Sequence, residues 1–158
     1  MLPWYTEFNQ VLGVGDLNKA TDSLINEIRE SKSISSFIEN NSSEFDAFLF
    51  VKKLQSLLEI KSMSKQKLIR ESCLNSSYVY DILGAKKAPS KDTVIKLSFA
   101  LGLTLPETNR LLELAGYSNL YPRIEREAII IFCIENQKGL HYANDLLHSM
   151  QEDELIGH

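Results

Sequence analysis

The apolar residues of this chain recur mostly at spacings of three and four, and no stretch alternates apolar and polar side chains at every second position. Spacings of three and four place side chains on one face of an α-helix, whereas alternation is typical of a half-buried strand. Only four prolines and seven glycines interrupt the 158 residues. The pattern therefore predicts an all-helical fold.

Two short amphipathic helices are expected near the amino terminus. One apolar stripe includes Leu24 and Ile28, and the next includes Ile34 and Phe37. A short polar linker follows them, so residues 1–43 are expected to form a helical N-terminal extension. The start of the extension is apolar but lacks the basic residues of a secretory leader, which predicts a cytoplasmic protein.

Residues 44–116 are expected to hold five helices, because a small polar residue that can cap a helix precedes each apolar stripe. The expected capping residues are Ser43, Ser64, Asn75, Ser90 and Thr104. Thr104 is followed at the third position by Glu107, which is the pattern of a capping box. This segment is interpreted as one compact domain.

Residues 117–158 are expected to form a C-terminal helical pair. The first helix carries apolar residues such as Ile129 and Phe132, and the second runs from about His141 to Met150. The acidic residues that follow are expected to fray. No internal repeat is evident in the apolar pattern.

The basic residues are concentrated in one part of the chain. Residues 61–96 hold eight of the seventeen basic residues and three of the twenty-one acidic ones, so this window carries +5 and the remainder carries −9. The whole-chain charge of −4 hides this asymmetry. Charges interact over about 8 Å at physiological salt, so a phosphate would respond to the local window. We therefore place the function in residues 61–96.

Other kinds of chemistry receive little support. Cys73 and Cys133 lie far apart without metal-spaced neighbours, which indicates packing residues in a reducing compartment. His141, Asp145 and His148 share one helix face, but a solvated face is favoured over a metal site because no fourth ligand is close. No set of acid and base groups suggests catalysis. We expect no metal, no other cofactor and no enzymatic activity.

The longest apolar run is Ala128 to Ile134, far shorter than the roughly 20 residues of a membrane-spanning helix. The chain is therefore expected to be soluble and to have no membrane partner.

The string MSKQKLIRESCLNSSYVYDILGAKKAPSKDTVIKLSFALGLTLPET resembles the helix-turn-helix module of phage lambda repressor and Cro proteins, the XRE family of bacterial regulators. The matching positions are Ser64, Ser72, Cys73, Asn75, Gly84, Ala85, Lys86, Lys87, Pro89 and Ser90. The resemblance covers about residues 45–116. The segment LAGYSNLYPR and the helices expected after it resemble the C-terminal part of longer family members, which bear a C-terminal helical pair.

The resemblance implies a lambda-repressor-like module of five helices whose third helix enters the major groove of double-stranded DNA. With Val79, Ile82 and Leu83 buried by helical periodicity, the opposite face would read bases. The candidate base contacts are Ser76, Ser77, Tyr80 and Asp81. The candidate phosphate contacts are Lys65, Lys67, Lys86, Lys87 and Lys91.

The sequence departs from the family pattern in two respects. Cys73 stands at the turn where relatives usually carry glycine, which predicts mild backbone strain. Ser76 and Ser77 stand where many relatives carry arginine or glutamine, which predicts modest or water-assisted base readout.

The implied function is a sequence-specific transcriptional regulator, most simply a repressor, that binds a palindromic operator as a homodimer. The C-terminal helices, with Ile129 to Phe132 and Ile134, are expected to form the dimer interface or, alternatively, to pack against residues 1–43. The alternative function is a protein-interaction adaptor on a helix-turn-helix scaffold with weak or no base readout. A protein partner for the N-terminal extension belongs to both interpretations.

Overall fold

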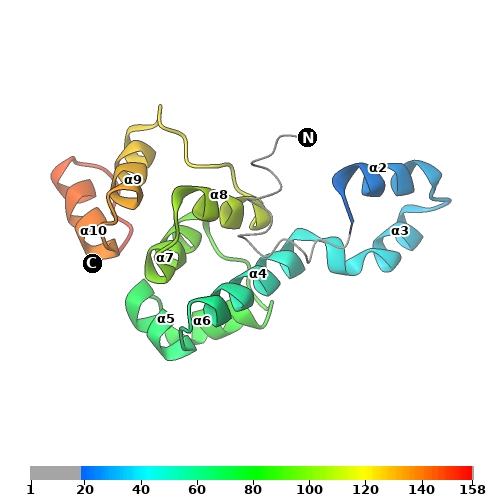
Figure 1. The fold of residues 1–158 in the computed structure, drawn as a ribbon, viewed down its shortest axis with the longest axis horizontal. Coiled ribbons are helices and arrows are strands. Elements are labelled where there is room, and N and C mark those ends of the chain that lie inside the picture. The colour runs from blue at the N-terminus through cyan, green and yellow to red at the C-terminus, as the bar shows by residue number, and fades with distance from the viewer. Residues whose placement is uncertain (1–18, 158) are drawn as a thin grey trace. The chain divides into compact units, whose positions relative to one another are not determined.

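The computed structural model describes residues 19–157, which contain nine α-helices, one short 3-10 helix and no strand (Figure 1). The expected all-helical fold is confirmed for these residues. The chain divides into two compact units, residues 1–49 and residues 50–158. The C-terminal helices thus belong to the same unit as the helices expected over 44–116. Residues 1–18 of the expected N-terminal extension lie outside the described residues.

The first unit contains α2 (Thr21–Glu30) and α3 (Ile34–Asn40), the two short helices expected from the apolar stripes. They pack against each other, and a polar cluster joins their ends. The ammonium of Lys19 donates to a carboxylate oxygen of Glu27 at 2.9 Å and to the amide oxygen of Asn41 at 2.8 Å. The bond from Lys19 holds the pKa of Glu27 below its ordinary value, against an opposing effect of desolvation. The Glu27 carboxylate therefore stays ionised, and the cluster persists, as the pH falls into the moderately acidic range.

A 3-10 turn, Ser42–Glu44, follows α3 and precedes α4 (Asp46–Ile60). Ser43 lies inside this turn, so the expected cap at Ser43 is wrong. The physical reason is that Phe45, between the turn and the helix, adopts an extended backbone. The ring of Phe45 packs edge-on against Phe37, with centroids 6.4 Å apart.

The second unit starts within α4. Its further helices are α5 (Lys65–Ser72), α6 (Ser76–Leu83), α7 (Lys91–Leu101), α8 (Leu105–Leu114), α9 (Glu125–Glu135) and α10 (Leu140–Ser149). Ser64, Asn75, Ser90 and Thr104 each accept a backbone N–H in the first turn of α5 to α8. These four caps and the capping box are confirmed.

Helix α7 is the centre of this unit, because it packs against α5, α8 and α10. Leu97 on α7 and Leu68 on α5 are completely buried, and Leu112 on α8 is completely buried as well. Burying one such side chain contributes about 1.5 to 3 kcal/mol. The core of the unit therefore runs from α5 into the C-terminal helices.

The pair α7–α8 is repeated by the pair α9–α10, which the apolar pattern had not revealed. Helices α8 and α10 both have ten residues, and α10 begins 35 positions after α8. The turns between the helices also match at this shift. Gly102 and Gln137 both have positive φ, at 63° and 53°. Gly116 and Gln151, after the second helix of each pair, also have positive φ, at 84° and 62°.

The hydrogen bonds of the two pairs correspond in the same way. The amides of Leu103 and Lys138 donate to the carbonyls of Ser98 and Cys133, respectively. Asn109 accepts from the amide of Leu120 at 3.0 Å, and Asn144, 35 positions later, accepts at 2.8 Å from the amide of Ile156, one position beyond the counterpart of Leu120. The agreement of turns, bonds and helix lengths identifies a structural repeat of about 35 residues.

The two pairs form a group of four helices with a symmetric contact pattern. Helix α7 contacts α8 and α10, and α9 contacts α10 and α8, so the contact pattern is unchanged when the pairs are exchanged. A cleft lies where the two equivalent turns meet. Its lining includes the corresponding residues Phe99 and Ile134, and also Gly102 and Gln137.

The segment after α10 is folded, so the expected fraying is wrong. Leu155 is buried, as is Leu120 at the corresponding position of the first pair. Asn144 holds the amide of Ile156, and the Arg126 side chain donates to the carbonyl of Asp153 at 2.7 Å. These contacts form because α10, like α8 in the first pair, carries an asparagine that binds the segment following the helix.

Within residues 19–157, no helix combines the length and apolar character that crossing a bilayer requires.

Candidate nucleic-acid interface

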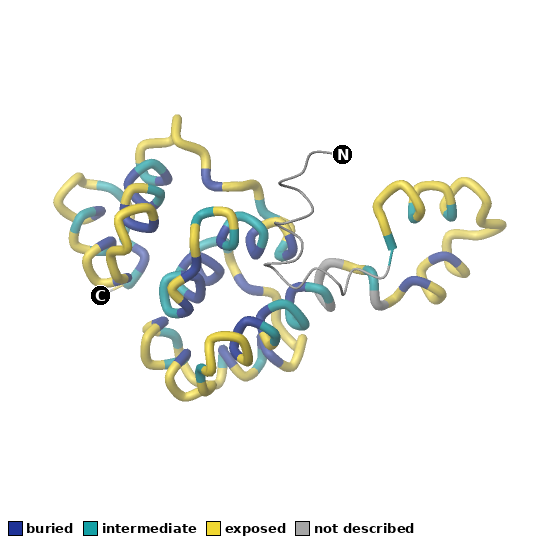
Figure 2. The backbone as a smooth tube through the Cα atoms, viewed as in Figure 1, coloured by how far each residue is buried: buried dark blue, intermediate teal, exposed yellow. Residues whose placement is uncertain are grey.

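Helix α6 presents one buried face and one polar exposed face. Val79 and Ile82 are each 1% exposed, because they point into the unit with Leu83. Helical geometry then turns Ser76, Ser77 and Tyr80 outward, and all three are exposed. Figure 2 shows both buried and exposed positions along α6. The expected burial of the apolar face of this helix is confirmed.

Asp81, the fourth candidate for base contact, is only partly available. Its carboxylate lies 3.3 Å from the ammonium of Lys87 and is 31% exposed. Its backbone carbonyl accepts from the amides of Lys86 at 2.8 Å and Lys87 at 3.3 Å. Ala85 makes the sharp reversal with φ of 56°. These bonds hold the loop after α6 against Asp81 and so fix the backbone positions of Lys86 and Lys87.

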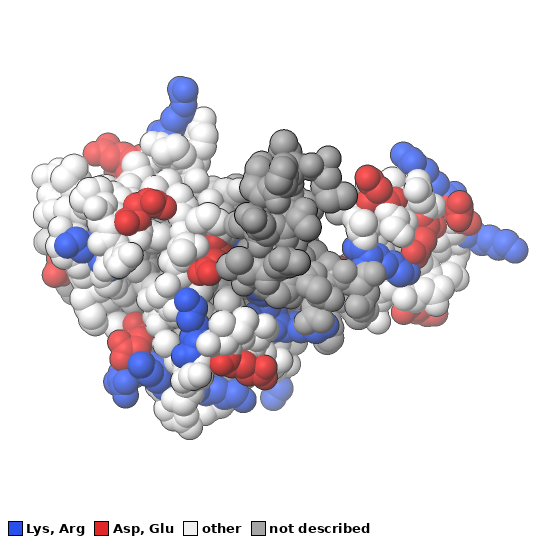
Figure 3. Space-filling view, in the orientation of Figure 1, with Lys and Arg blue, Asp and Glu red and all other residues white. Residues whose placement is uncertain are grey.

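Two more lysines approach α6 from α5. The ammonium of Lys65 lies 5.9 Å from the centre of the Tyr80 ring, within range of a cation–π contact. Lys67 is exposed two residues further along the same helix, about half a turn away. Lysine and arginine side chains gather over α5 and α6, with acidic side chains among them (Figure 3). The outward face of α6 is therefore bordered by cations from α5 and from the following loop.

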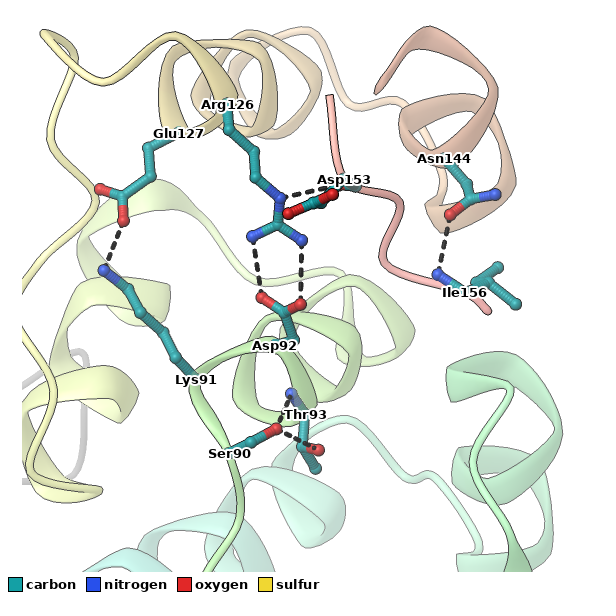
Figure 4. A network of polar contacts seen from close by, with 9 residues as sticks. All are labelled: Ser90, Lys91, Asp92, Thr93, Arg126, Glu127, Asn144, Asp153 and Ile156. Atoms are coloured by element: carbon teal, nitrogen blue, oxygen red, sulfur yellow. Dashed lines mark hydrogen bonds and ion pairs between the residues drawn. The ribbon is translucent and has the colours of Figure 1, made fainter. Parts of the chain in front are cut away.

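Lys91 is separated from this set. Its ammonium forms an ion pair with the Glu127 carboxylate on α9, and the two side chains are 25% and 11% exposed (Figure 4). The second oxygen of Glu127 accepts from the Tyr121 amide at 2.6 Å. Because its charge is matched inside the unit, we leave Lys91 out of the candidate phosphate contacts.

A second ion pair, at the start of α7, was not foreseen. Arg126 on α9 donates two parallel bonds of 2.9 Å to the carboxylate of Asp92 (Figure 4). Such fork-like pairs are among the stronger charged hydrogen bonds. The two residues lie 34 positions apart, so no local sequence rule pairs them. These contacts tie the helix after the lysine loop to the C-terminal pair.

The histidines of the C-terminal pair do not converge with Asp145. His141 lies with its Nε2 atom 3.6 Å from the Cys73 sulfur, and the Nδ1 atom of His148 lies 2.5 Å from Glu154. Among residues 19–157, no three potential metal ligands of the His, Cys, Asp and Glu types group together. Cys133 is fully buried, and desolvation raises the pKa of its thiol. It serves as a packing residue.

No protein-family model, curated protein or solved structure matches this chain.

The turn between α5 and α6 contains the strained position expected from the sequence. Cys73 has φ of 55° and ψ of 27°, in the left-handed region. A side chain in this region costs about 1 kcal/mol or more relative to glycine. Cys73→Gly is therefore expected to raise the free energy of unfolding by about 0.5 to 1 kcal/mol.

Urea denaturation of Cys73→Gly and Cys73→Ala separates strain from the contact with His141. Both variants lose the sulfur, but only the glycine variant loses the β-carbon. The glycine variant should be the more stable of the two. Equal stability would show that the backbone at residue 73 stores no strain.

Proposed function

We propose that this chain is a transcriptional regulator that binds double-stranded DNA by placing α6 in the major groove. Helices α4 to α8 would form a lambda-repressor-like module. One observation carries the proposal: α6 buries its apolar face and presents a polar face bordered by Lys65, Lys67, Lys86 and Lys87. The groove is about 12 Å wide and admits one helix in this way.

In the proposed complex, α6 enters amino terminus first. The hydroxyls of Ser76 and Ser77 can donate to or accept from several base edges, and the ring of Tyr80 can contact a thymine methyl group. Asp81 can accept from a cytosine amino group only by sharing its carboxylate with Lys87. Base readout then rests on few groups, and shape or water-mediated contacts supply the rest.

Phosphate contacts would supply most of the affinity. Four lysines per subunit border α6, and a dimer would neutralise about eight phosphates, which gives a log-log salt slope near −7. One module makes few contacts with DNA, so two copies bound to a palindrome would double the number of contacts.

The dimer interface needs revision from the sequence expectation. Ile129, Ile130 and Ile134 are buried within the second unit, where α9 packs against α8 and α10. These side chains are not available to a second copy. The homodimer stays in the proposal without an assigned interface.

A selection from a random duplex library tests the proposal. The parent chain should enrich a shared palindromic sequence. A variant with Ser76→Asp and Ser77→Asp should enrich none, because two carboxylates at the front of α6 repel phosphates. Negative charge in the first turn of a helix is stabilising, so this variant keeps its fold. Enrichment of no sequence by the parent chain would contradict DNA-specific regulation.

The adaptor function is a second candidate, favoured by two observations. The leading side chains of α6 are short, and the Asp81 carboxylate is paired with Lys87. An adaptor would bind its protein partner equally well with Lys86 and Lys87 changed to alanine. A regulator would lose its operator in the same variant.

A further inference from the structure

An apolar groove lies on the outer side of α9 and α10. It is lined by Glu125, Ala128, Ile129, Phe132, Leu146 and Met150. Phe132 is 50% exposed and Met150 is 49% exposed, so both large side chains border open space. An exposed apolar depression with a charged rim is typical of an interaction surface.

The internal repeat shows what occupies the same face in the first pair. At a shift of 35 residues, Phe132 corresponds to Leu97 and Ala128 corresponds to Thr93. Leu97 is completely buried, and Thr93 is 4% exposed. Helix α5 packs on α7, and the Tyr78 hydroxyl on α6 lies 3.4 Å from the Thr93 hydroxyl. The face that is open in the second pair is covered by helices in the first.

The covering helix α5 has a definite chemical character. Leu68 and Ser72, one turn apart, are both completely buried. Lys65, Lys67 and Arg70 of the same helix are exposed. A helix of this kind inserts one leucine and one small residue and turns basic residues to solvent.

The surroundings of the open groove favour the same chemistry. Residues 117–157 contain seven acidic and three basic residues, and two of the acidic ones, Glu127 and Glu154, face Lys91 and His148. Glu125 lines the groove itself and is exposed. Two of the three basic residues are Arg126, which is engaged by Asp92, and Lys138, which lies over the Tyr142 ring. Acidic surroundings attract a basic partner and disfavour an acidic one.

We propose that the α9–α10 groove binds a basic amphipathic helix of a partner protein, which inserts a leucine and a small residue beside Phe132. This is the helix-in-groove mode of recognition, with the groove formed by the second half of an internal repeat. The inference does not depend on DNA binding, and it holds for a regulator as well as for an adaptor.

A nuclear magnetic resonance titration of the full chain tests the inference. The probe is a synthetic peptide with the sequence of residues 61–75 and serine in place of Cys73, because α5 is the known example of the required chemistry. Amide shifts should saturate at Ala128, Phe132, Leu146 and Met150. A peptide with Leu68→Ser should bind at least about tenfold more weakly, because it loses the buried leucine.

Protein variants supply the matched controls. Phe132→Asp should abolish the shifts, whereas Ile60→Asp, at an equally exposed apolar site on α4, should leave them unchanged. Met150→Asp, at the other side of the groove, is an independent variant in case Phe132→Asp does not fold. Both groove variants should retain the parent spectrum elsewhere.

Three results would overturn the inference. The first is the absence of saturable shifts at millimolar peptide. The second is a set of shifts on α7 with none on α9, which would mean that the peptide displaces the native α5. The third is a set of groove shifts that depends on protein concentration without peptide, which would assign the groove to a second copy of the chain.

Discussion

Replacement of Lys86 and Lys87 by alanine is expected to weaken operator binding and to flatten its dependence on salt. Both lysines begin in a loop whose amides are bonded to the carbonyl of Asp81. They are therefore held beside the exposed face of α6, where phosphates would lie. Each phosphate contact contributes about −0.9 to the log-log salt slope. Loss of two contacts per subunit should change the slope of a dimer from about −7 to about −4.

A gel-shift series from low to moderate salt measures this change. The matched control is the double variant Lys32→Ala and Lys138→Ala, which removes the same charge from exposed sites outside residues 61–96. The control should keep the parent slope. The Lys87 pair with Asp81 is an exposed one, worth about 0 to 1 kcal/mol, so the test variant keeps its fold. Equal slopes for the two double variants would exclude the loop from the DNA contacts.

Glu127→Ala is expected to lower the free energy of unfolding by about 3 kcal/mol, near the lower end of the range for breaking a buried pair. The substitution leaves the Lys91 ammonium without its carboxylate and the Tyr121 amide without its acceptor. The cost is expected at the lower end of that range because a quarter of the Lys91 side chain is exposed to water. A further small loss comes from the cavity left on α9.

Urea denaturation measures the effect, and Glu125→Ala is the matched control. Glu125 is exposed on the same helix, so its removal should change stability by less than about 0.5 kcal/mol. Replacing both partners, as Lys91→Met with Glu127→Leu, should restore most of the loss, because no charge is then left unpaired. A loss below about 1 kcal/mol for Glu127→Ala would show that water replaces the carboxylate at little cost.

The parts of the fold that follow local rules could be predicted from the sequence. A cap such as Asn75 or Ser90 and the apolar stripe after it lie within one or two turns, so the residues that decide the helix start are neighbours in the chain. The outward direction of Ser76 and Ser77 follows from the burial of Val79 by the same geometry. The strained backbone at Cys73 follows from its place in the turn.

The parts that depend on distant partners could not be predicted. Lys91 was grouped with the loop lysines because it follows them in the chain, but its partner Glu127 is 36 positions later. Helix α9 is apolar around most of its circumference, so its pattern alone did not separate buried Ile130 from exposed Phe132. The repeat was hidden because Gln137 and Gln151 make turns that glycine makes in the first pair.

The fork between Arg126 and Asp92 gives the C-terminal helices a role in shaping the other half of the unit. Asp92 lies in the first turn of α7, the helix that follows the loop of Lys86 and Lys87, and Arg126 also donates to the backbone of the tail at Asp153. A fragment cut after residue 116 would lose this brace together with the packing of α9 and α10. A fragment that holds only α4 to α8 would thus be less rigid than the same residues in the intact protein.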